Sequence, residues 1–314
     1  MLDPRRLRLL REVSRRGTIA AAAEELNFTA SAVSQQLATL ERDLGVPLLE
    51  RTARSVRLTE AGRVLCEHAN YVLAALDAAE QSVHAVAGLS GGRLRVSTFA
   101  SAAVTFGTDA LSAFDQAHPN VDLSFVELEP EFSIPAVRRG ELDLAIAVQF
   151  AGLPRPDMTA LRQIDLGVDP LRLVMSAADP AARRATVRLI DLADRRWISS
   201  WPEVGFQAVT EMACRRAGFE PKVAFRADSY EVVLKLAQAG LGVSLVPQPA
   251  LVDLPGLVTL AVSPAEVPPR EVFAVTRAAD ESPAVMEMLR LMRSLAAERH
   301  VAAAGAHDRG VSKG

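Results

Sequence analysis

Apolar residues recur at helical spacing in three consecutive segments at the start of the chain. The pattern predicts helices over residues 5–16, 18–26 and 29–44. Thr18 and Thr29 are placed as N-caps of the second and third helices, and Gly45 ends the third. Because a short turn joins the second helix to the third, the pair has the pattern of a helix-turn-helix.

The third predicted helix carries hydroxyl and amide groups on its exposed face, with little charge. A helical wheel places four apolar side chains on one buried stripe: Val33, Leu37, Leu40 and Leu44. In a helix-turn-helix the second helix enters the major groove, where serine and glutamine side chains hydrogen-bond to base edges. We therefore expect Ser31, Ser34 and Gln35 to read bases. Taken alone, this segment is also compatible with a solvated helix in a small bundle.

A short hairpin follows the third helix and is predicted to form a wing. Residues 48–59 alternate hydrophobic and basic side chains around a turn. Basic side chains on such a turn reach the adjacent minor groove or its phosphates, and helix N-termini also bind phosphate. The residues expected to make these contacts are Thr18, Thr29, Arg42, Arg51 and Arg54. Arg57, in the same hairpin, is equally compatible with an ordinary surface residue.

A long helix is predicted from Thr59 to about Leu89. Its apolar residues are spaced alternately four and three positions apart: Leu65, Ala69, Val72, Leu76, Ala79, Val83 and Val86. A seam with this period is typical of a helix that pairs with a second helix in a coiled coil. The alternative is a single long helix that lies on its own domain.

Beyond a glycine-rich segment at 88–92, short apolar runs alternate with helical segments. The predicted strands are 93–98, 121–128, 142–148, 171–176, 196–200, 222–225, 243–247 and 271–275. The predicted helices between and after them are 101–117, 131–139, 187–194, 205–217, 229–239 and 283–298. This order predicts parallel sheets with helices on their faces, arranged as two α/β units.

Charge is distributed unevenly along the chain. Residues 1–63 carry 11 arginines against 8 acidic residues, whereas the whole chain has a net charge of −3. A basic front end on an acidic body indicates that the front end meets a polyanion. No apolar run is long enough to span a bilayer, and the basic N-terminus lacks the apolar core of a signal peptide. We therefore expect a cytoplasmic protein with no membrane partner.

Other classes of function fit these patterns less well. No glycine-rich phosphate loop follows a strand, there is no nucleophile elbow, and the histidines show no metal spacing. We therefore expect no enzymatic activity, no metal and no cofactor. A transport binding protein would share the α/β units but not residues 1–60. Cys66 and Cys214 leave redox sensing open, although two structural cysteines fit a reducing compartment better.

Three segments together form a known family pattern: GTIAAAAEELNFTASAVSQQLATLERDLGVPLLERTARSVRLTEAG (17–62), GELDLAI (140–146) and AGLGVSLVP (239–247). Through them residues 1–300 resemble the LysR-type transcriptional regulators. The resemblance implies a multidomain fold: an N-terminal all-α winged helix-turn-helix, a long linker helix, and a C-terminal α/β effector domain of two Rossmann-like subdomains. The implied boundaries are 1–60, 61–89 for the linker and dimerisation helix, 90–298 for the effector domain and 299–314 for a disordered tail. Subdomain one combines 93–167 with 268–298, and subdomain two is 168–267.

The resemblance also implies a function. Such a regulator binds double-stranded DNA as a dimer, through the linker helix, or as a tetramer, and responds to a small-molecule effector held between the subdomains. Carried over by position, the effector contacts are Ser101, Gln149, Ser199, Ser200, Trp201, Arg226 and Ser229. Arg226 and the helix N-termini favour an anionic effector. A redox-responsive regulator and a cytoplasmic small-molecule-binding protein with the periplasmic-binding fold are the alternatives.

The chain departs from the family pattern in the third helix and in one segment of the effector domain. In the helix, Ser31 stands where members often have proline, and Gln35 replaces a frequent arginine, which favours adenine or water-mediated readout over guanine. Ala30 stands where many members have glutamine, so the base preference at that end of the helix stays open. The segment EPEF (129–132) stands where members commonly place a polar effector contact, so that contact is open as well.

Overall fold

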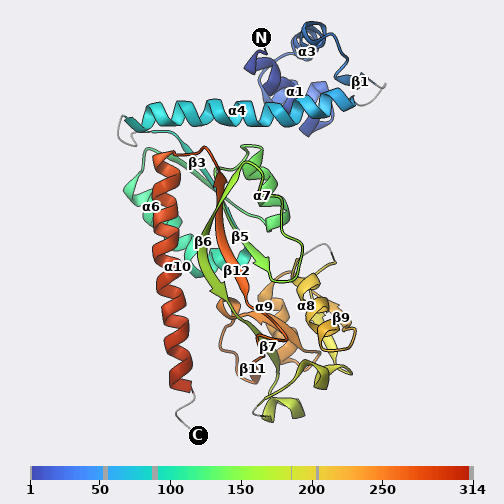
Figure 1. Cartoon of the computed structure of the whole chain (residues 1–314), viewed down its shortest axis with the longest axis vertical. Helices are drawn as coiled ribbons and strands as arrows, with labels where there is room; N and C mark the ends of the chain where they lie inside the picture. The colour runs from blue at the N-terminus through green and yellow to red at the C-terminus, as the bar shows by residue number, and fades with distance from the viewer. Residues whose placement is uncertain (1, 52–55, 87–90, 185, 203–204, 311–314) are drawn as a thin grey trace.

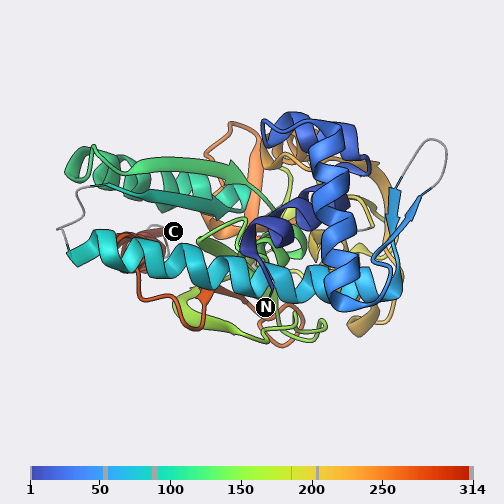
Figure 2. The ribbon, with the colours of Figure 1, turned by 90° about the horizontal axis from the view of Figure 1, so that it is seen from above.

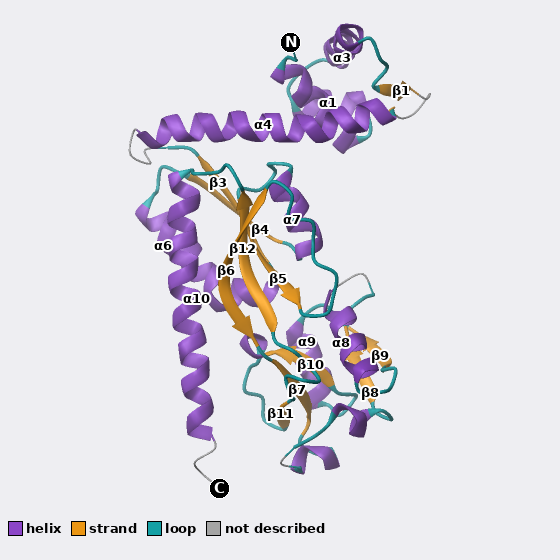
Figure 3. Cartoon of the chain, in the orientation of Figure 1, coloured by secondary structure: helices purple, strands orange, loops and turns teal. Residues whose placement is uncertain are grey.

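The structure is a computed structural model, and it describes residues 2–51, 56–86, 91–184, 186–202 and 205–310. It has three parts: a helical N-terminal segment, the long helix α4 and an α/β body (Figure 1). Apart from one short hairpin in the N-terminal segment, the strands lie in the body (Figure 3). This arrangement is the predicted fold class.

Three helices and a hairpin form the N-terminal segment. They are α1 (Pro4–Arg16), α2 (Ile19–Glu25), α3 (Ala30–Leu44), β1 (Leu49–Arg51) and β2 (Val56–Leu58). The apolar faces of the helices meet in one small core, in which Leu10, Val33 and Leu37 are fully buried. The prediction that Leu44 belongs to the buried stripe is wrong, because α3 ends at this residue and its side chain is 39% exposed.

Helix α4 (Glu60–Val86) begins against the N-terminal segment and continues beyond it, as the view from above shows (Figure 2). At its start, Ala69 is buried against Leu7 of α1. Farther along the predicted seam, Leu76 is 38% exposed and Val83 is 72% exposed. The start of the seam is therefore covered by the chain's own helices, and its later part is open in a single chain.

The first sheet of the body has five strands. In spatial order they are β4 (Asp122–Glu127), β3 (Arg93–Thr98), β5 (Leu144–Phe150), β12 (Arg270–Arg277) and β6 (Leu161–Asp169). The strands β4, β3 and β5 are parallel, as predicted, whereas β12 is antiparallel to both of its neighbours. The sheet is mixed because β12 returns from the far end of the body, and β6 is a strand that the sequence pattern did not predict.

Helices cover both faces of this sheet. They are α5 (Ala100–Ala102), the π-helical turn η1 (Ala103–Gly107), α6 (Thr108–Ala117), α7 (Pro130–Arg138) and α10 (Pro283–Gly310). Alternate residues of β5 face opposite sides, so Ile146 packs with α6 and α10 while Ala147 packs with α7. Helix α10 continues through most of the predicted disordered tail, because the alanines at 302–304 and 306 favour helix.

The second sheet region is smaller. Its elements are β7 (Leu171–Ser176), η2 (Pro180–Arg183), η3 (Leu189–Leu192), β8 (Arg196–Ser199), α8 (Gly205–Arg216), β9 (Lys222–Arg226), α9 (Tyr230–Gln238), β10 (Ser244–Pro247), η4 (Gln248–Ala250) and β11 (Leu257–Ala261). The strand order is β10-β7-β11, with β8 and β9 paired beside it. The helix predicted at 187–194 is only the 3₁₀ turn η3, in which Leu189 and Leu192, one turn apart, are both buried.

A helix that crosses a membrane must be both long and apolar. Within the ranges that the structure describes, no helix is long and apolar enough to cross a bilayer.

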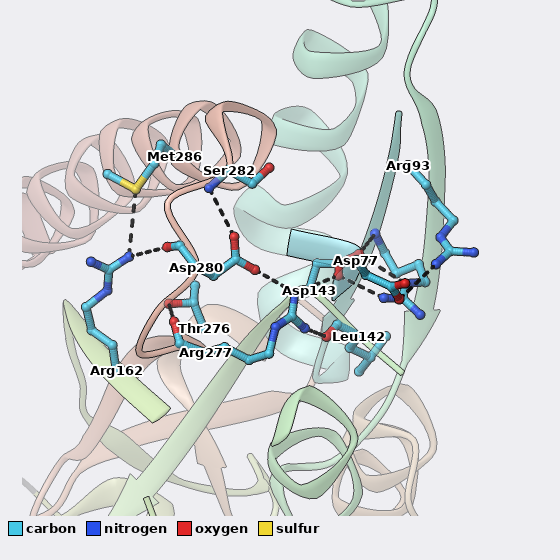
Figure 4. A network of polar contacts seen from close by, with 11 residues as sticks. Asp77, Arg93, Leu142, Asp143, Arg162, Thr276, Arg277, Asp280, Ser282 and Met286 are labelled. Atoms are coloured by element: carbon cyan, nitrogen blue, oxygen red, sulfur yellow. Dashed lines mark hydrogen bonds and ion pairs between the residues drawn. The ribbon is translucent and has the colours of Figure 1, made fainter. Parts of the chain in front are cut away.

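Polar and close contacts attach α4 to its neighbours on both sides. The carboxylate of Asp77 on α4 accepts a hydrogen bond from Arg8 of α1 at 3.3 Å, and it lies 4.0 Å from the guanidinium of Arg93 on β3 (Figure 4). Gly140, with a φ of 70°, closes the turn after α7 next to Ala74 of α4, and an added Cβ would lie 2.8 Å from the Ala74 Cβ. A side chain at Gly140 would therefore separate α4 from the body.

A buried carboxylate joins three segments of the first sheet. Asp143 is fully buried and its carboxylate accepts hydrogen bonds from the side chain of Arg95 at 2.8 and 3.0 Å and from Arg277 at 3.1 Å. Arg277 also donates to Asp280 at 2.6 Å and to the carbonyl of Leu142 at 2.8 Å (Figure 4). Burial alone would raise the pKa of Asp143, but the hydrogen bonds and charge of the two arginines outweigh it and hold the pKa below its ordinary value.

Candidate nucleic-acid interface and candidate effector cleft

Helix α3 lies on the side of the N-terminal segment that faces away from the body (Figure 1). Its first turn is capped by Thr29, whose hydroxyl accepts a hydrogen bond from the N–H of Ala32 at 3.2 Å and lies 3.2 Å from the hydroxyl of Ser31. Thr18 caps α2 in the same way, through the N–H of Ala21. Both threonines therefore occupy the N-cap positions that their sequence context predicts.

The exposed face of α3 brings together the residues predicted to read bases. Ser31, Gln35 and Arg42 are exposed, and Ser34 is half-buried. The next residue, Gln36, is directed elsewhere, since its amide oxygen accepts a hydrogen bond from Arg6 of α1 at 3.1 Å. The helix thus presents small hydroxyls and one amide outward, above a stripe that is fully buried.

The predicted wing is a hairpin held against α3. The strands β1 and β2 pair in antiparallel register. The carboxylate of Glu41 on α3 accepts hydrogen bonds from the backbone N–H groups of Leu48 and Leu49, at 2.8 and 3.1 Å. Arg51 is the last residue of β1, and Arg54 lies outside the described residues. The hairpin therefore starts at a defined position beside α3.

A cavity of about 370 Å³ lies between the two sheet regions of the body. Its walls come from the segments that follow β3 and β4, from the end of β5, and from the first residues of α8 and α9. The strands β3, β4 and β5 are parallel, so their carboxyl ends meet at this edge of the sheet. Clefts at the carboxyl ends of parallel strands are the usual ligand sites of α/β folds.

One side of the cavity contains a buried ion pair. The guanidinium of Arg270 donates hydrogen bonds to Asp169 at 2.8 and 3.2 Å and to the Ser101 hydroxyl at 2.7 Å, and it lies 4.9 Å from the centre of the Phe99 ring. Asp169 ends β6 and Arg270 begins β12, so the pair joins the two places where the chain crosses between the sheets. Its charges neutralise each other.

The cavity lining also includes two carboxylates and an amide. Glu129 and Glu131 belong to the EPEF segment at the start of α7. Burial raises the pKa of Glu129 to about 7, and the charge of Glu131 adds to the increase. The amide nitrogen of Gln149, a residue only 8% exposed, donates to the carbonyl oxygens of Phe150 at 2.9 Å and Leu153 at 3.1 Å.

Aromatic and proline side chains make up much of the remaining wall. The rings are those of Phe99, Phe150, Phe206 and Tyr230. Phe206 and Tyr230 meet edge to face, with centroids 5.6 Å apart. The cavity therefore suits a ligand with an apolar body.

Most residues predicted to contact an effector do not line this cavity. Gln149 does, whereas the other six stand outside its lining: Ser101, Ser199, Ser200, Trp201, Arg226 and Ser229. Arg226 donates to the carbonyl of Ser200 at 2.6 Å and to the amide oxygen of Gln207 at 3.2 Å, so its guanidinium is held by protein groups. The expectation of an anionic effector depended on Arg226 and on helix N-termini, and it loses the support of Arg226.

The sequence pattern missed most of the cavity's polar residues. Glu129 and Glu131 lie in the EPEF segment, which departs from the family pattern. The sequence alone does not show which way their side chains point. Arg270 reaches the cavity only because β12 returns beside β6, a pairing between segments far apart in the chain. A single sequence carries no local signal for such a pairing.

Both cysteines are buried as free thiols. Burial raises the pKa of Cys66, and it raises the pKa of Cys214 to about 12. Cys66 packs in the core of the N-terminal segment and Cys214 in that of the body. Reactive cysteines need an accessible thiolate, so this geometry favours structural thiols over a redox pair.

Comparison with known proteins identifies both parts of the chain. Residues 4–63 match the model of the bacterial regulatory helix-turn-helix protein, lysR family, and residues 87–297 match that of the LysR substrate binding domain. The transcriptional dual regulator GltC of Bacillus subtilis is 29% identical over 85% of this chain and 87% of its own length. The regulator BudR of Raoultella terrigena is 30% identical over 79% of this chain and 85% of its own length.

Solved structures share the fold along almost the whole chain. A full-length OxyR variant from Pseudomonas aeruginosa has a TM-score of 0.73 at 22% identity, and covers 94% of this chain and 95% of its own. CbnR complexed with its target DNA has a TM-score of 0.59 at 23% identity, and covers 94% of this chain and 100% of its own.

Proposed function

The chain belongs to the LysR family of bacterial transcriptional regulators, and we propose that it couples two binding surfaces: α3 for DNA and the cavity between the sheets for a small effector. It acts by binding, without catalysing a reaction, and it works in the cytoplasm where its DNA lies. The boundaries 1–60, 61–89 and 90–298 divide it into the DNA-binding domain, the linker helix and the effector domain.

The outward face of α3 carries the DNA-binding half of this proposal. Ser31 and Gln35 are exposed over a fully buried stripe, and the helix faces away from the body. Side chains of these types hydrogen-bond to base edges in the major groove, and one glutamine amide can form two hydrogen bonds to the same adenine. Thr18, Thr29 and Arg42 are assigned to phosphates, as are Arg51 and Arg54 of the wing. CbnR, which shares the fold, has been solved with its target DNA.

The two neighbouring glutamines of α3 allow a matched test of this assignment. We expect Gln35→Ala to weaken binding to the native operator, found by footprinting upstream regions, by about 1–3 kcal/mol. We expect Gln36→Ala, which removes an amide held against α1, to bind nearly as the wild type does. Fluorescence anisotropy with operator and scrambled duplexes at one salt concentration measures both. Equal operator affinities in the two variants would contradict the assigned face.

The exposed part of the α4 seam supports self-association. Leu76 and Val83 are open in the single chain, at the spacing of a coiled coil, and LysR-type regulators form oligomers. A dimer joined through α4 holds two α3 helices at once, and an effector that changes the angle between the sheets would change the spacing of the two helices on DNA.

A further inference from the structure

The polar groups of the cavity differ in whether the protein already satisfies them. The two guanidiniums among the described lining residues have carboxylate partners: Arg270 is paired with the buried Asp169, and Arg155, whose side chain is 73% exposed, lies 3.7 Å from the carboxylate of Glu271. The amide nitrogen of Gln149 also donates to backbone carbonyls. A ligand acceptor that approached these side-chain donors would therefore compete with contacts that the fold already makes.

The acceptors of the cavity are not engaged in this way. Within the described residues, neither Glu129 nor Glu131 is in ion-pair contact with a cationic side chain, and Gln149 Oε1 receives no hydrogen bond. Gln149 is more than nine-tenths buried, and its orientation is fixed by the carbonyls that its nitrogen contacts. An acceptor oxygen that lines the cavity and receives no protein hydrogen bond is available to bind a ligand N–H.

The carboxylate of Glu131 reaches across the cleft toward the second sheet region. A methyl group added at Gly205, the first residue of α8, would lie 3.3 Å from Oε1 of Glu131 and 3.6 Å from the Phe150 ring. The carboxylate and the Phe150 ring therefore both lie close to the start of α8, where the two regions face each other. Carboxylates together with aromatic faces form the usual surroundings of an organic cation.

We infer that the effector is a small organic amine, protonated at neutral pH, whose cationic N–H groups are bound by Glu129, Glu131 and the amide oxygen of Gln149 and whose apolar body lies among the aromatic rings. This inference rests on the proposed function, because it takes the cavity as the effector site. A bound ammonium would contact α7, which packs on the first sheet, and would come close to α8 in the second sheet region. It would therefore favour an arrangement in which the two sheet regions lie close together.

The charges around Glu129 predict how binding depends on pH. Glu131, Glu127 and Asp228 oppose ionisation of Glu129, whereas Arg270 favours it. A cationic ligand adds positive charge beside this group of carboxylates, and it binds best when Glu129 is ionised. The affinity for an amine is therefore expected to rise between about pH 6 and about pH 8, by up to about tenfold.

Three probes of nearly equal shape test the ligand class: phenethylamine, phenethyl alcohol and phenylacetate. Isothermal titration calorimetry with the full chain should show the amine binding about tenfold or more tightly than the alcohol, and phenylacetate binding most weakly. Glu131→Gln and Glu129→Gln should each remove most of this preference. Glu127→Gln removes a neighbouring carboxylate outside the cavity lining and should preserve it. Tighter binding of phenylacetate, or equal binding of all three probes, would overturn the inference.

A blocking variant separates failure of the ligand class from failure of the site. Gly205→Leu places a side chain beside Glu131 and the Phe150 ring, so it should abolish amine binding while operator binding through α3 persists. If phenylacetate binds tightest and Gly205→Leu abolishes that binding, the cavity remains the effector site and only the amine class is wrong. If the amine binds equally to the wild type and to Gly205→Leu, the cavity is not the site, and the inference and the effector half of the proposed function fail together.

Discussion

Replacing Asp143 by asparagine should be among the most damaging single changes in the effector domain. The carboxylate is fully buried and accepts two hydrogen bonds from the Arg95 side chain, one from the Arg95 backbone N–H and one from Arg277. Asparagine keeps the shape but offers one acceptor oxygen, and its NH₂ group would face N–H donors. The substitution also leaves two guanidiniums without the charge that compensates them.

The magnitude follows from what each arginine retains. Removing one partner of a buried ion pair costs about 3–5 kcal/mol. Arg277 keeps Asp280 and the carbonyl of Leu142, whereas the Arg95 side chain is 18% exposed and turns partly to water. We therefore expect the lower end of the range, about 3 kcal/mol, which lowers the melting temperature of a domain of this size by roughly 6–12 °C.

Urea unfolding followed by tryptophan fluorescence measures this loss, because both tryptophans of the chain lie in the effector domain. Asp191→Asn is the matched control: Asp191 also has two arginine partners, at 3.2 and 3.4 Å, but those side chains are 74% and 57% exposed. A change of about 0–1 kcal/mol is expected there. Equal losses in the two variants would refute the reasoning that burial decides the cost of breaking the pair.

Three further outcomes are expected. Leu76→Asp should convert oligomers to monomers in sedimentation, whereas Val64→Asp, exposed on α4 outside the seam, should not; an unchanged Leu76→Asp would place dimerisation elsewhere. Mild peroxide and iodoacetamide should leave Cys66 and Cys214 unmodified by mass spectrometry in the native protein, because burial raises both pKa values. The pKa of Glu129 is raised from 4.5 to about 7, so the wild type should lose stability as the pH rises through that window, and Glu129→Gln should not; parallel urea midpoints would contradict this.

Local patterns predicted the DNA-binding half in detail because its elements are set by neighbours in the chain. Thr29 caps α3 through a residue three positions away, and the spacing of Val33, Leu37 and Leu40 alone defines the buried stripe. The pattern failed at Leu44, where the helix ends and no neighbouring surface remains to cover the side chain. In the body, the sequence pattern missed β6, whose pairing with β12 joins segments about a hundred residues apart in the chain.

The cavity between the sheet regions shows why the charge of a ligand is hard to predict from a sequence. The family pattern points to the carboxyl ends of the strands, and Gln149 lines the cavity there. The charge that a ligand meets depends on which groups the protein has already paired. Arg226 is engaged by Ser200 and Gln207, and Arg270 by Asp169. A count of charged residues near the cleft would include these arginines as anion sites. Their hydrogen bonds to protein groups show instead that the cavity's carboxylates are the charged groups that lack an ion-pair partner among the described residues. An anion would fit if these arginines were unpaired, whereas an amine fits because they are already paired within the protein. The pairing depends on contacts between distant segments, which a single sequence does not record.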